Sequence, residues 1–388
     1  MKKNIAVMFG GKSSEYEVSL MSAESIIKNL DKNKYNIIFI GITKTGQWLT
    51  GADVFKKFQE GLKNKSSHTP AFNPPPERGP ASPKLKRGER KEEGVKNKQG
   101  LSEIILDPNH NKFINAETKK QIKTDVIFPV FHGPYGEDGS MQGLFEIMGI
   151  PYVGAGILGS AVGLDKVIQK QILDNAGAPV VVYGWIQDGE FFSNGGKVVE
   201  KINFQKVLKY IGLPCFVKPA NAGSSIGISV VKNSNEIKSA IELAKRYDKK
   251  VIIEQVVDNM REFECSILGN DKPEASVVGE IASANEFYDY DAKYINEKSR
   301  LIIPAKISKA LSTQMQKLAV KAYKLLNCRG MARVDFLYDA KNKKLYLNEI
   351  NTIPGFTQIS MYPKLWEASG LSYGKLLDKL IDLATDGK

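Results

Sequence analysis

The sequence predicts an α/β protein of two to three domains, and three observations support that class. The chain has 388 residues, and a domain takes about 150 residues. Hydrophobic residues make up 42% and charged residues 25%, the balance of an ordinary globular protein. Short apolar runs alternate with segments of helical periodicity, as in a sheet whose strands are connected by helices.

The first 153 residues predict an open, doubly wound α/β layer. Three apolar runs are typical of buried parallel strands: residues 3–9, 35–43 and 124–133. Between the first two runs, apolar residues recur at helical spacing, which gives a βαβ unit. A short helix and a further strand are expected at 140–149 and 150–154.

The pattern changes after residue 153. A helix is expected over 160–177, and a helix, a strand, a glycine-rich loop and a second strand follow within 207–231. From residue 262 strands dominate, with long helices at 310–326 and 371–384. We predict a small α+β segment over 154–255 and a strand-rich segment over 256–388, with a nucleotide held between two sheets.

Residues 60–100 have a different composition from the rest of the chain. They contain ten Lys or Arg against five Glu, six prolines, and almost no apolar side chain after Phe72. Such a stretch cannot bury enough surface to offset its ordering entropy, so we predict a mobile low-complexity insertion. The alternative is a polyanion-binding segment. The absence of aromatic residues among the charges disfavours nucleic-acid binding.

Several protein classes are excluded. No stretch approaches the roughly 18 apolar residues of a transmembrane helix, and the N-terminal apolar run is too short for a signal peptide. The three cysteines, Cys215, Cys265 and Cys328, are widely separated and odd in number, which implies no disulfide framework. We predict a cytoplasmic protein with no membrane partner.

Two glycine-rich loops are candidate anion sites. Residues 10–14 follow the first strand, but Ala6 stands where a P-loop needs its first glycine. They form either a simple turn or an anion site at a helix start, with Glu15 offering a carboxylate to an amine. Residues 221–227 suit phosphate oxygens, because Lys218 adds a charge next to the glycines and hydroxyls. A plain hairpin loop would not explain that lysine.

The predicted hairpin 331–351 carries a candidate metal site. Glu349 and Asn351 are two residues apart on one strand and share a face, and Asp335 is expected at the same height on the partner strand. Three oxygen ligands suit a hard cation such as Mg²⁺ shared with phosphates, and Arg333 lies on the same face. The alternative is a solvated hairpin face with a surface salt bridge.

Histidines and cysteines show no zinc-ligand spacing. His132 alone among the three histidines lies in a glycine loop after a strand, which leaves a functional and a structural role open. The candidate phosphate loop, the lysines and the candidate metal-binding carboxylates together indicate a reaction that uses ATP. They do not identify the substrate that accepts the phosphoryl group.

With these motifs the chain resembles the D-alanine–D-alanine ligases of the ATP-grasp superfamily. The resemblance covers nearly the whole chain outside residues 60–100, and its motifs lie at residues 10–26, 132–143, 150–156, 164–166, 218–228, 286–294, 333–336 and 348–357. It implies an ATP-grasp fold with three domains: an N-terminal Rossmann-like domain, a small central domain and a larger C-terminal domain. ATP would lie between the last two.

The resemblance also implies roles for individual residues. ATP would contact Lys166, Lys218, Ser225, Glu254, Val257, Glu262 and Lys293. Two Mg²⁺ ions, with Mn²⁺ as a substitute, would bind Asp335, Glu349 and Asn351. The first D-alanine would be bound by Glu15 and His132, and the carboxylate of the second by Ser360 and Met361. Catalysis would depend on a hydrogen-bonded set of Glu15, Ser224 and Tyr294, and on an oxyanion site formed by Arg333 and the Gly355 amide.

The implied reaction is ATP-dependent formation of D-alanyl-D-alanine through an acyl phosphate, for peptidoglycan synthesis in the cell wall. A closing loop is expected at 286–299, and a homodimer is expected from the resemblance. The rival interpretations are a D-alanine–D-lactate or D-alanine–D-serine ligase, another ATP-grasp carboxylate–amine ligase, and a non-catalytic polyanion-binding protein. Tyr294, which follows Lys293, favours D-alanine over D-lactate as the second substrate.

Overall fold

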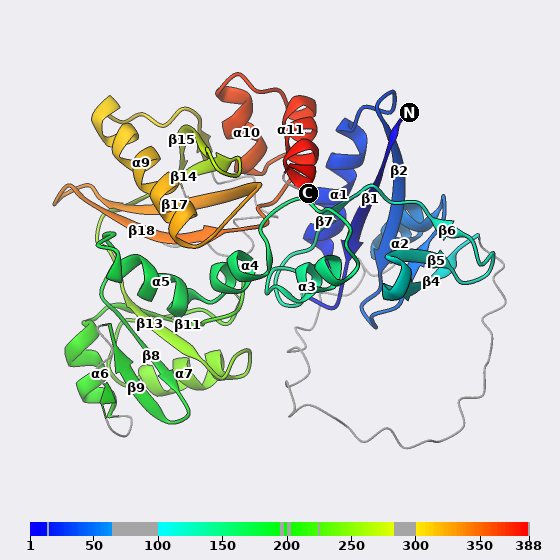
Figure 1. The fold of residues 1–388 in the computed structure, drawn as a ribbon. Helices are drawn as coiled ribbons and strands as arrows, with labels where there is room; N and C mark the ends of the chain where they lie inside the picture. The colour runs from blue at the N-terminus through cyan, green and yellow to red at the C-terminus, as the bar shows by residue number, and fades with distance from the viewer. Residues whose placement is uncertain are drawn as a thin grey trace, which may run out of the picture.

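A computed structural model of the chain describes residues 1–13, 15–63, 100–194, 198–199, 203–223, 226–282 and 300–386. These residues form three β-sheets with helices packed against them (Figure 1). The sheets follow one another along the chain, in the order that the sequence predicts. Within the described ranges, no helix combines the length and the apolarity needed to cross a membrane.

The first sheet is a mixed sheet built around a buried parallel core. Strand β1 (Lys3–Gly10) pairs in parallel with β2 (Tyr35–Ile42) on one side and β7 (Val126–Val130) on the other, as the apolar runs predict. The antiparallel extension beyond β2 was not predicted, and it consists of β3 (Trp48–Thr50), β4 (Ser102–Asp107), β5 (Lys112–Asn115) and β6 (Gln121–Ile122). The segment's helices are α1 (Tyr16–Asn29), α2 (Val54–Lys63), the 3-10 helix η1 (Pro108–His110) and α3 (Ser140–Ile147).

The prediction of a strand at 150–154 is wrong. In the structure this segment makes a single parallel bridge between Ile127 and Tyr152. Pro151 has no amide hydrogen to give to a ladder, which limits pairing to one bridge. The segment still contributes apolar side chains to the core, since Ile150, Tyr152 and Val153 are buried.

The second sheet is antiparallel. Its strands are β8 (Tyr183–Gln187), β9 (Glu190–Ser193), β10 (Val198–Val199), β11 (Cys215–Pro219), β12 (Ser229–Val231) and β13 (Val251–Gln255). The helices of this part are α4 (Ile157–Leu164), α5 (Lys166–Asn175), α6 (Phe204–Ile211) and α7 (Ile237–Lys245). The single helix expected over 160–177 is therefore two helices. Asp165 separates them, because its side chain accepts the amides of Val167 and Ile168 and so caps α5.

The third sheet is also antiparallel. Its strands are β14 (Met260–Leu268), β15 (Glu274–Ala282), β16 (Arg300–Ile302), β17 (Met331–Asp339) and β18 (Lys344–Asn351), and its part of the chain holds helices α9 (Lys309–Leu325), α10 (Met361–Ala368) and α11 (Tyr373–Thr385). The predicted hairpin and both long helices are confirmed. Helix α10 was not predicted from the sequence.

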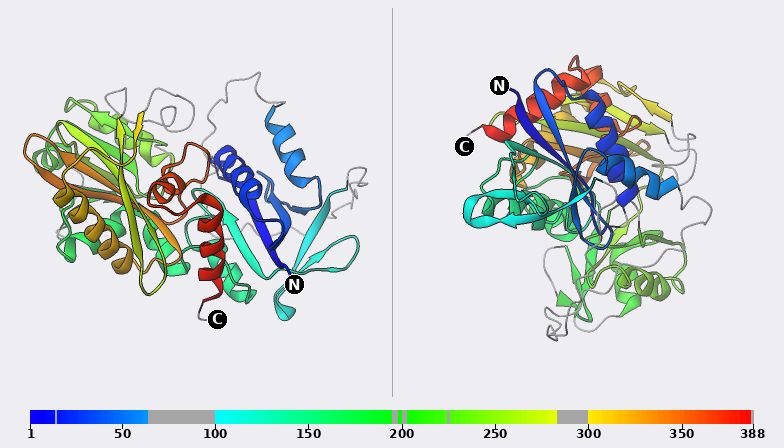
Figure 2. Two further views of the ribbon diagram at one scale, coloured as in Figure 1. Left: turned by 90° about the horizontal axis from the view of Figure 1, so that it is seen from above. Right: turned by 90° about the vertical axis from the view of Figure 1, so that its right-hand side faces the viewer.

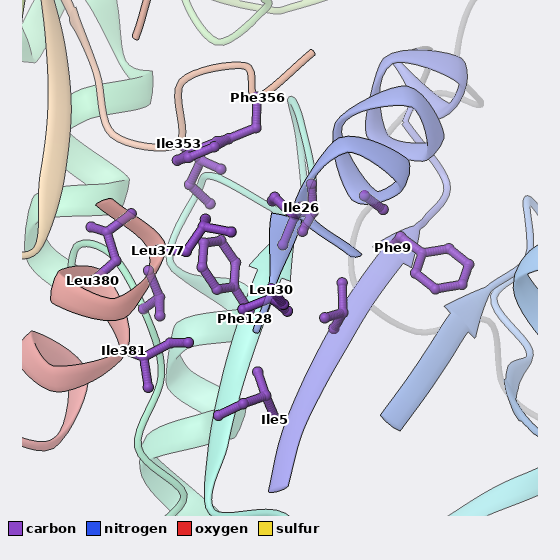
Figure 3. Close-up of a cluster of buried hydrophobic side chains, with 14 of the residues drawn as sticks. Ile5, Phe9, Ile26, Leu30, Phe128, Ile353, Phe356, Leu377, Leu380 and Ile381 are labelled. Carbon is purple, nitrogen blue, oxygen red and sulfur yellow. The ribbon is translucent and has the colours of Figure 1, made fainter. Parts of the chain in front are cut away.

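Helix α11 leaves the third sheet and packs against the first. Its Leu377, Leu380 and Ile381 share a buried cluster with Ile5 of β1 and Phe128 of β7 (Figure 3). Both views of Figure 2 place this red helix beside the blue N-terminal elements. Two ion pairs flank the contact: Lys34–Asp378 at 2.6 Å and Lys3–Asp382 at 3.4 Å. The C-terminal helix thus packs against the N-terminal sheet. The domain boundaries at residues 153 and 255 stay predictions.

Candidate active site

A cavity of about 350 Å³ lies where the three parts of the chain meet. Most of the residues predicted from the sequence line it: Glu15, His132, Lys166, Lys218, Glu254, Glu262, Arg333, Glu349, Asn351, Gly355, Ser360 and Met361. Val257 and Asp335 are not among the lining residues. Ser224, Ser225, Lys293, Tyr294 and the expected closing loop at 286–299 fall outside the described residues.

Glu254 lies on β13 with a lysine on each side. The exposed fraction of its side chain is 2%, and its carboxylate forms ion pairs with Lys170, at 2.9 Å, and with Lys218. Burial disfavours the charge on Glu254, but the two ammonium groups outweigh burial and lower its pKa to about 2. Lys218 is thereby held, charged, at the wall of the cavity.

Lys170 was not singled out from the sequence. It lies on α5, where a lysine is normally solvent-exposed, yet its exposed fraction is 1%. Its Nζ donates to the main-chain oxygen of Asn348 on β18 at 2.9 Å in addition to pairing with Glu254. Lys170 therefore connects the second sheet to the strand that carries Glu349 and Asn351. Only tertiary packing distinguishes it from a surface lysine.

Lys166 spans the cavity at the start of α5. Its Nζ donates to the main-chain oxygen of Ala222 in the glycine-rich loop at 2.8 Å. It also lies 3.5 Å from Oε2 of Glu349. One ammonium group thus joins the second sheet's loop to the third sheet's carboxylate.

The predicted carboxylate pair on the hairpin is confirmed. Asp335 on β17 pairs with Glu349 on β18, and Arg333 pairs with Asn351. Arg333 donates to Oδ1 and Oδ2 of Asp335, both at 2.7 Å, and Asn351 donates to Oδ2 at 3.0 Å. Arg333, Glu349 and Asn351 line the cavity, and the side chains of Arg333, Asp335 and Glu349 are at most 20% exposed, which excludes the alternative of a solvated surface hairpin.

Among the described residues, no group of three or more His, Cys, Asp or Glu is arranged to hold a metal ion by itself. Asp335, Glu349 and Asn351 nevertheless form a donor set of carboxylate and amide oxygens. Such a set is typical of Mg²⁺, which is usually bound by one or two carboxylates plus substrate phosphates. The donor chemistry therefore fits a cation shared with a nucleotide.

Glu15 lies between two glycines from different parts of the chain. Its exposed fraction is 4%. A Cβ atom added at Gly133, in the loop after β7, would lie 2.5 Å from Glu15 Oε2, and one added at Gly223 would lie 2.7 Å from it. Only residues without a side chain allow so close an approach. The glycines of both loops are thus explained by the carboxylate that they enclose.

His132 is buried beside the loop that carries Gly355. Its exposed fraction is 6%. Burial, with a smaller effect of Arg333, lowers its pKa to about 4, so the imidazole is neutral at pH 7. Ser22 Oγ of α1 lies 3.4 Å from His132 Nε2 and accepts the Phe356 amide at 3.2 Å. His132 thus has both a structural contact and a place in the cavity wall.

Glu137 is a second carboxyl group near Glu15, and the sequence analysis did not single it out. It lines the cavity and accepts the Gly133 amide at 2.6 Å. Burial and repulsion from Glu15 raise its pKa to about 8. Its position in the loop after β7, five residues beyond His132, was the available signal.

Helix α10 begins at the cavity with Ser360 and Met361. Ser360 Oγ accepts the Thr357 amide at 3.0 Å, and a Cβ atom at Gly355 would lie 2.8 Å from that oxygen. The Met361 side chain is buried in an apolar cluster with Ile281 and Leu365. The helix N-terminus therefore presents amide groups next to Gly355, an arrangement that favours anions.

The fold and the cavity define a class. The second and third sheets are antiparallel and bring buried lysines and carboxylates to one cavity, which the N-terminal α/β part also lines. This is the architecture of an ATP-grasp enzyme. Comparison with known proteins narrows this class. The family profile "D-ala D-ala ligase N-terminus" matches residues 4–155, and the profile "D-ala D-ala ligase C-terminus" matches residues 172–382.

Relatives match over the full length. A D-alanine–D-alanine ligase of Thermoanaerobacter sp. strain X514 is 48% identical over 99% of this chain and 97% of its own, and one of Acetivibrio thermocellus is 46% identical over 99% and 96%. Among solved structures, the D-alanine–D-alanine ligase of Coxiella burnetii has a TM-score of 0.76 at 33% identity, covering 99% of this chain and 96% of its own. The VanG D-Ala:D-Ser ligase of Enterococcus faecalis has 0.77 at 34%, covering 99% and 100%.

The chain belongs to the D-alanine–D-alanine ligase family, and it is an ATP-dependent ligase. The resemblance, the fold class and the enzyme class predicted from the sequence are confirmed.

Proposed function

We propose that this enzyme joins two D-alanine molecules into D-alanyl-D-alanine, with ATP as the energy source, for peptidoglycan synthesis. One observation carries the proposal: Glu15, Lys166 and Glu349, from three separate parts of the chain, line a single cavity. A carboxylate for an amine, an ammonium group for phosphates and a carboxylate for a cation are then within one site. A cytoplasmic location and a homodimer are proposed with it on family resemblance, without a nucleic-acid or membrane partner.

ATP lies between the second and third sheets in this proposal. Lys166 and Lys218 hold its phosphates, since both ammonium groups reach the cavity wall. The adenine and the ribose lie toward Glu254, Val257 and Glu262. Glu254 also keeps Lys218 charged through their ion pair, and it forms a second ion pair with Lys170. Ser225 and Lys293 are proposed as further phosphate contacts.

Asp335, Glu349 and Asn351 hold two Mg²⁺ ions in this proposal, with Mn²⁺ as a substitute. When bound, the metal neutralises charge on the phosphate oxygens and helps align them for transfer. The chain's own residues do the rest of the positioning. Lys166 donates a 2.8 Å hydrogen bond to the Ala222 oxygen of the glycine-rich loop and lies 3.5 Å from Glu349. The same side chain therefore positions both the phosphate contacts and the metal contacts.

The first D-alanine is bound through its ammonium group by Glu15, beside the neutral His132. Transfer of the γ-phosphoryl group to its carboxylate oxygen gives an acyl phosphate and ADP. The amine of the second D-alanine then attacks the carbonyl carbon and loses a proton. The carbon–nitrogen bond forms, the carbon–oxygen bond to phosphate breaks, and inorganic phosphate leaves.

Arg333 and the Gly355 amide stabilise the oxyanion of the tetrahedral intermediate, as preorganised donors do in acyl transfer. The carboxylate of the second D-alanine binds at the N-terminus of α10. Because the Met361 side chain is buried among apolar residues, Met361 contributes its amide there, next to the Ser360 hydroxyl. Ser224 and Tyr294 are proposed to complete a hydrogen-bonded set with Glu15.

A second candidate is ligation of D-alanine to D-serine. The observation that favours it is the likeness to VanG, which is named a D-Ala:D-Ser ligase. A pocket that fits a methyl group rejects an added hydroxyl only weakly, by about 100-fold or less.

The test is release of phosphate by purified enzyme with ATP and Mg²⁺, with and without D-alanine. We expect release only with D-alanine, and none with L-alanine. Release that does not depend on D-alanine would contradict the proposal. A product containing D-serine from mixed substrates would instead favour the second candidate.

A further inference from the structure

Glu264 is a buried carboxylate of the cavity wall to which the roles above assign nothing. It lies on β14 with an exposed fraction of 6%, and it lines the cavity. Across the sheet it pairs with Asp335, which in turn pairs with Glu349. Three carboxylates therefore occupy one row over three adjacent strands.

Glu264 and Glu349 lie on the two strands that flank β17, the strand that carries both Asp335 and Arg333. Neighbouring strands are about 4.8 Å apart, so Glu264 and Glu349 are separated by roughly 10 Å of sheet. Arg333 Nε lies 3.0 Å from Glu264 Oε2, while the same guanidinium binds both oxygens of Asp335 at 2.7 Å. Glu264 and Asp335 thus share one arginine.

This sharing creates a competition. Asp335 is a proposed metal ligand, yet both its oxygens face Arg333. A cation bound to Asp335 would repel the guanidinium, since like charges at such distances interact strongly away from bulk water. A buried guanidinium that loses its anion is costly unless another anion replaces it.

We infer that Glu264 is a positioning residue that holds Arg333 when Asp335 binds the metal. It supplies the second anion, so that Asp335 exchanges the arginine for a cation while Arg333 stays at the oxyanion site. The inference rests on the proposed metal site and oxyanion role, and it adds a residue that touches neither the metal nor the substrate.

The test measures Mn²⁺ binding by the electron paramagnetic resonance signal of free Mn²⁺, with a non-hydrolysable ATP analogue present. Glu264→Gln should weaken Mn²⁺ binding about five-fold, because Arg333 then loses the charge of Glu264 and stays more firmly paired with Asp335. In an Arg333→Met background the same substitution should change binding less than about two-fold. Glu264→Asp keeps the charge and should bind Mn²⁺ within about two-fold of wild type.

Glu280→Gln is the matched control. Glu280 lies on β15 of the same sheet, outside the cavity lining, and pairs with Arg261 at 2.7 and 2.8 Å, closer than the 3.0 Å between Glu264 and Arg333. It should leave Mn²⁺ binding unchanged.

Two results would overturn the inference. Glu264→Gln could bind Mn²⁺ like wild type, or it could weaken binding equally with and without Arg333, which would mean a direct effect on the metal. Absence of Mn²⁺ binding by the wild-type enzyme would be a different failure. It would remove the proposed metal site itself, and the inference with it.

Discussion

Asp335 and Glu349 face each other directly across β17 and β18. The pairing puts two carboxylates on one face of the hairpin, with Lys166 3.5 Å from Glu349. The proposed function places a cation and the phosphates of ATP at this point of the third sheet. This relationship connects the sequence pattern to the chemistry of the site.

Asp335→Asn and Glu349→Gln should each lower kcat by about 100-fold or more, because each removes the charge of one proposed metal ligand while keeping its shape. The measurement is steady-state phosphate release over a range of Mg²⁺ concentrations, together with circular dichroism to confirm folding. Asp339→Asn, on the same strand near the turn, is the control. Activity like that of wild type in either ligand variant at ordinary Mg²⁺ would remove the metal assignment.

Gly223→Ala should lower kcat/KM for D-alanine about ten-fold or more, because its Cβ would lie 2.7 Å from Glu15 Oε2 and displace that carboxylate. Initial rates at varied D-alanine measure the effect. Gly61→Ala is the control, since a Cβ atom at Gly61 meets nothing within 4 Å. An unaffected Gly223→Ala enzyme would show that Glu15 need not be enclosed by the glycine loop.

Glu137 should make the free enzyme less stable as the pH rises. Its pKa is raised to about 8, above an unfolded value of about 4.3. The folded protein therefore binds a proton that the unfolded chain has released. The stability associated with that proton is fully present below about pH 4 and is lost as the pH rises toward 8.

Urea unfolding of the substrate-free protein between pH 5 and pH 8 tests this. Glu137→Gln should flatten the decline in free energy of unfolding, whereas Glu190→Gln, which removes an exposed carboxylate, should not. Parallel pH profiles for wild type and Glu137→Gln would contradict the raised pKa.

The insertion at 60–100 should be dispensable for catalysis. Among the described residues, none between 15 and 132 lines the cavity. Replacing residues 64–98 with a short Gly/Ser linker should leave kcat/KM within about three-fold, because loop-closure entropy grows slowly with length. Loss of activity in a variant that still folds would show that the segment contributes to the site.

Local patterns in the sequence were enough to predict that Asp335, Glu349 and Asn351 share one face of the hairpin. Alternation along a strand puts Glu349 and Asn351 on the same side, and the short turn of the hairpin fixes Asp335 opposite. Long-range packing was not accessible in this way. Nothing local to Leu377 or Leu380 indicates that they meet β1, more than 350 residues away in sequence.

The features that the sequence did not predict correctly have particular physical reasons. Asp165 separates α4 from α5 because it caps the N-terminus of α5. The apolar pattern continues across both helices, so the sequence predicted one helix. Helix α10 contains Pro363, which reads as a helix breaker although proline is tolerated in a first turn. Lys170 and Glu264 look like surface charges in sequence. Their partners, Glu254 and Arg333, come from other strands or helices.

The central claim is most directly tested by identifying the product made from ATP, Mg²⁺ and equimolar D-alanine, D-serine and D-lactate. Mass spectrometry of the ligated products measures which second substrate is used. The account predicts D-alanyl-D-alanine as the predominant product, with one ADP and one phosphate released per molecule formed. Predominant incorporation of D-serine or D-lactate, or ATP hydrolysis without any ligated product, would contradict it.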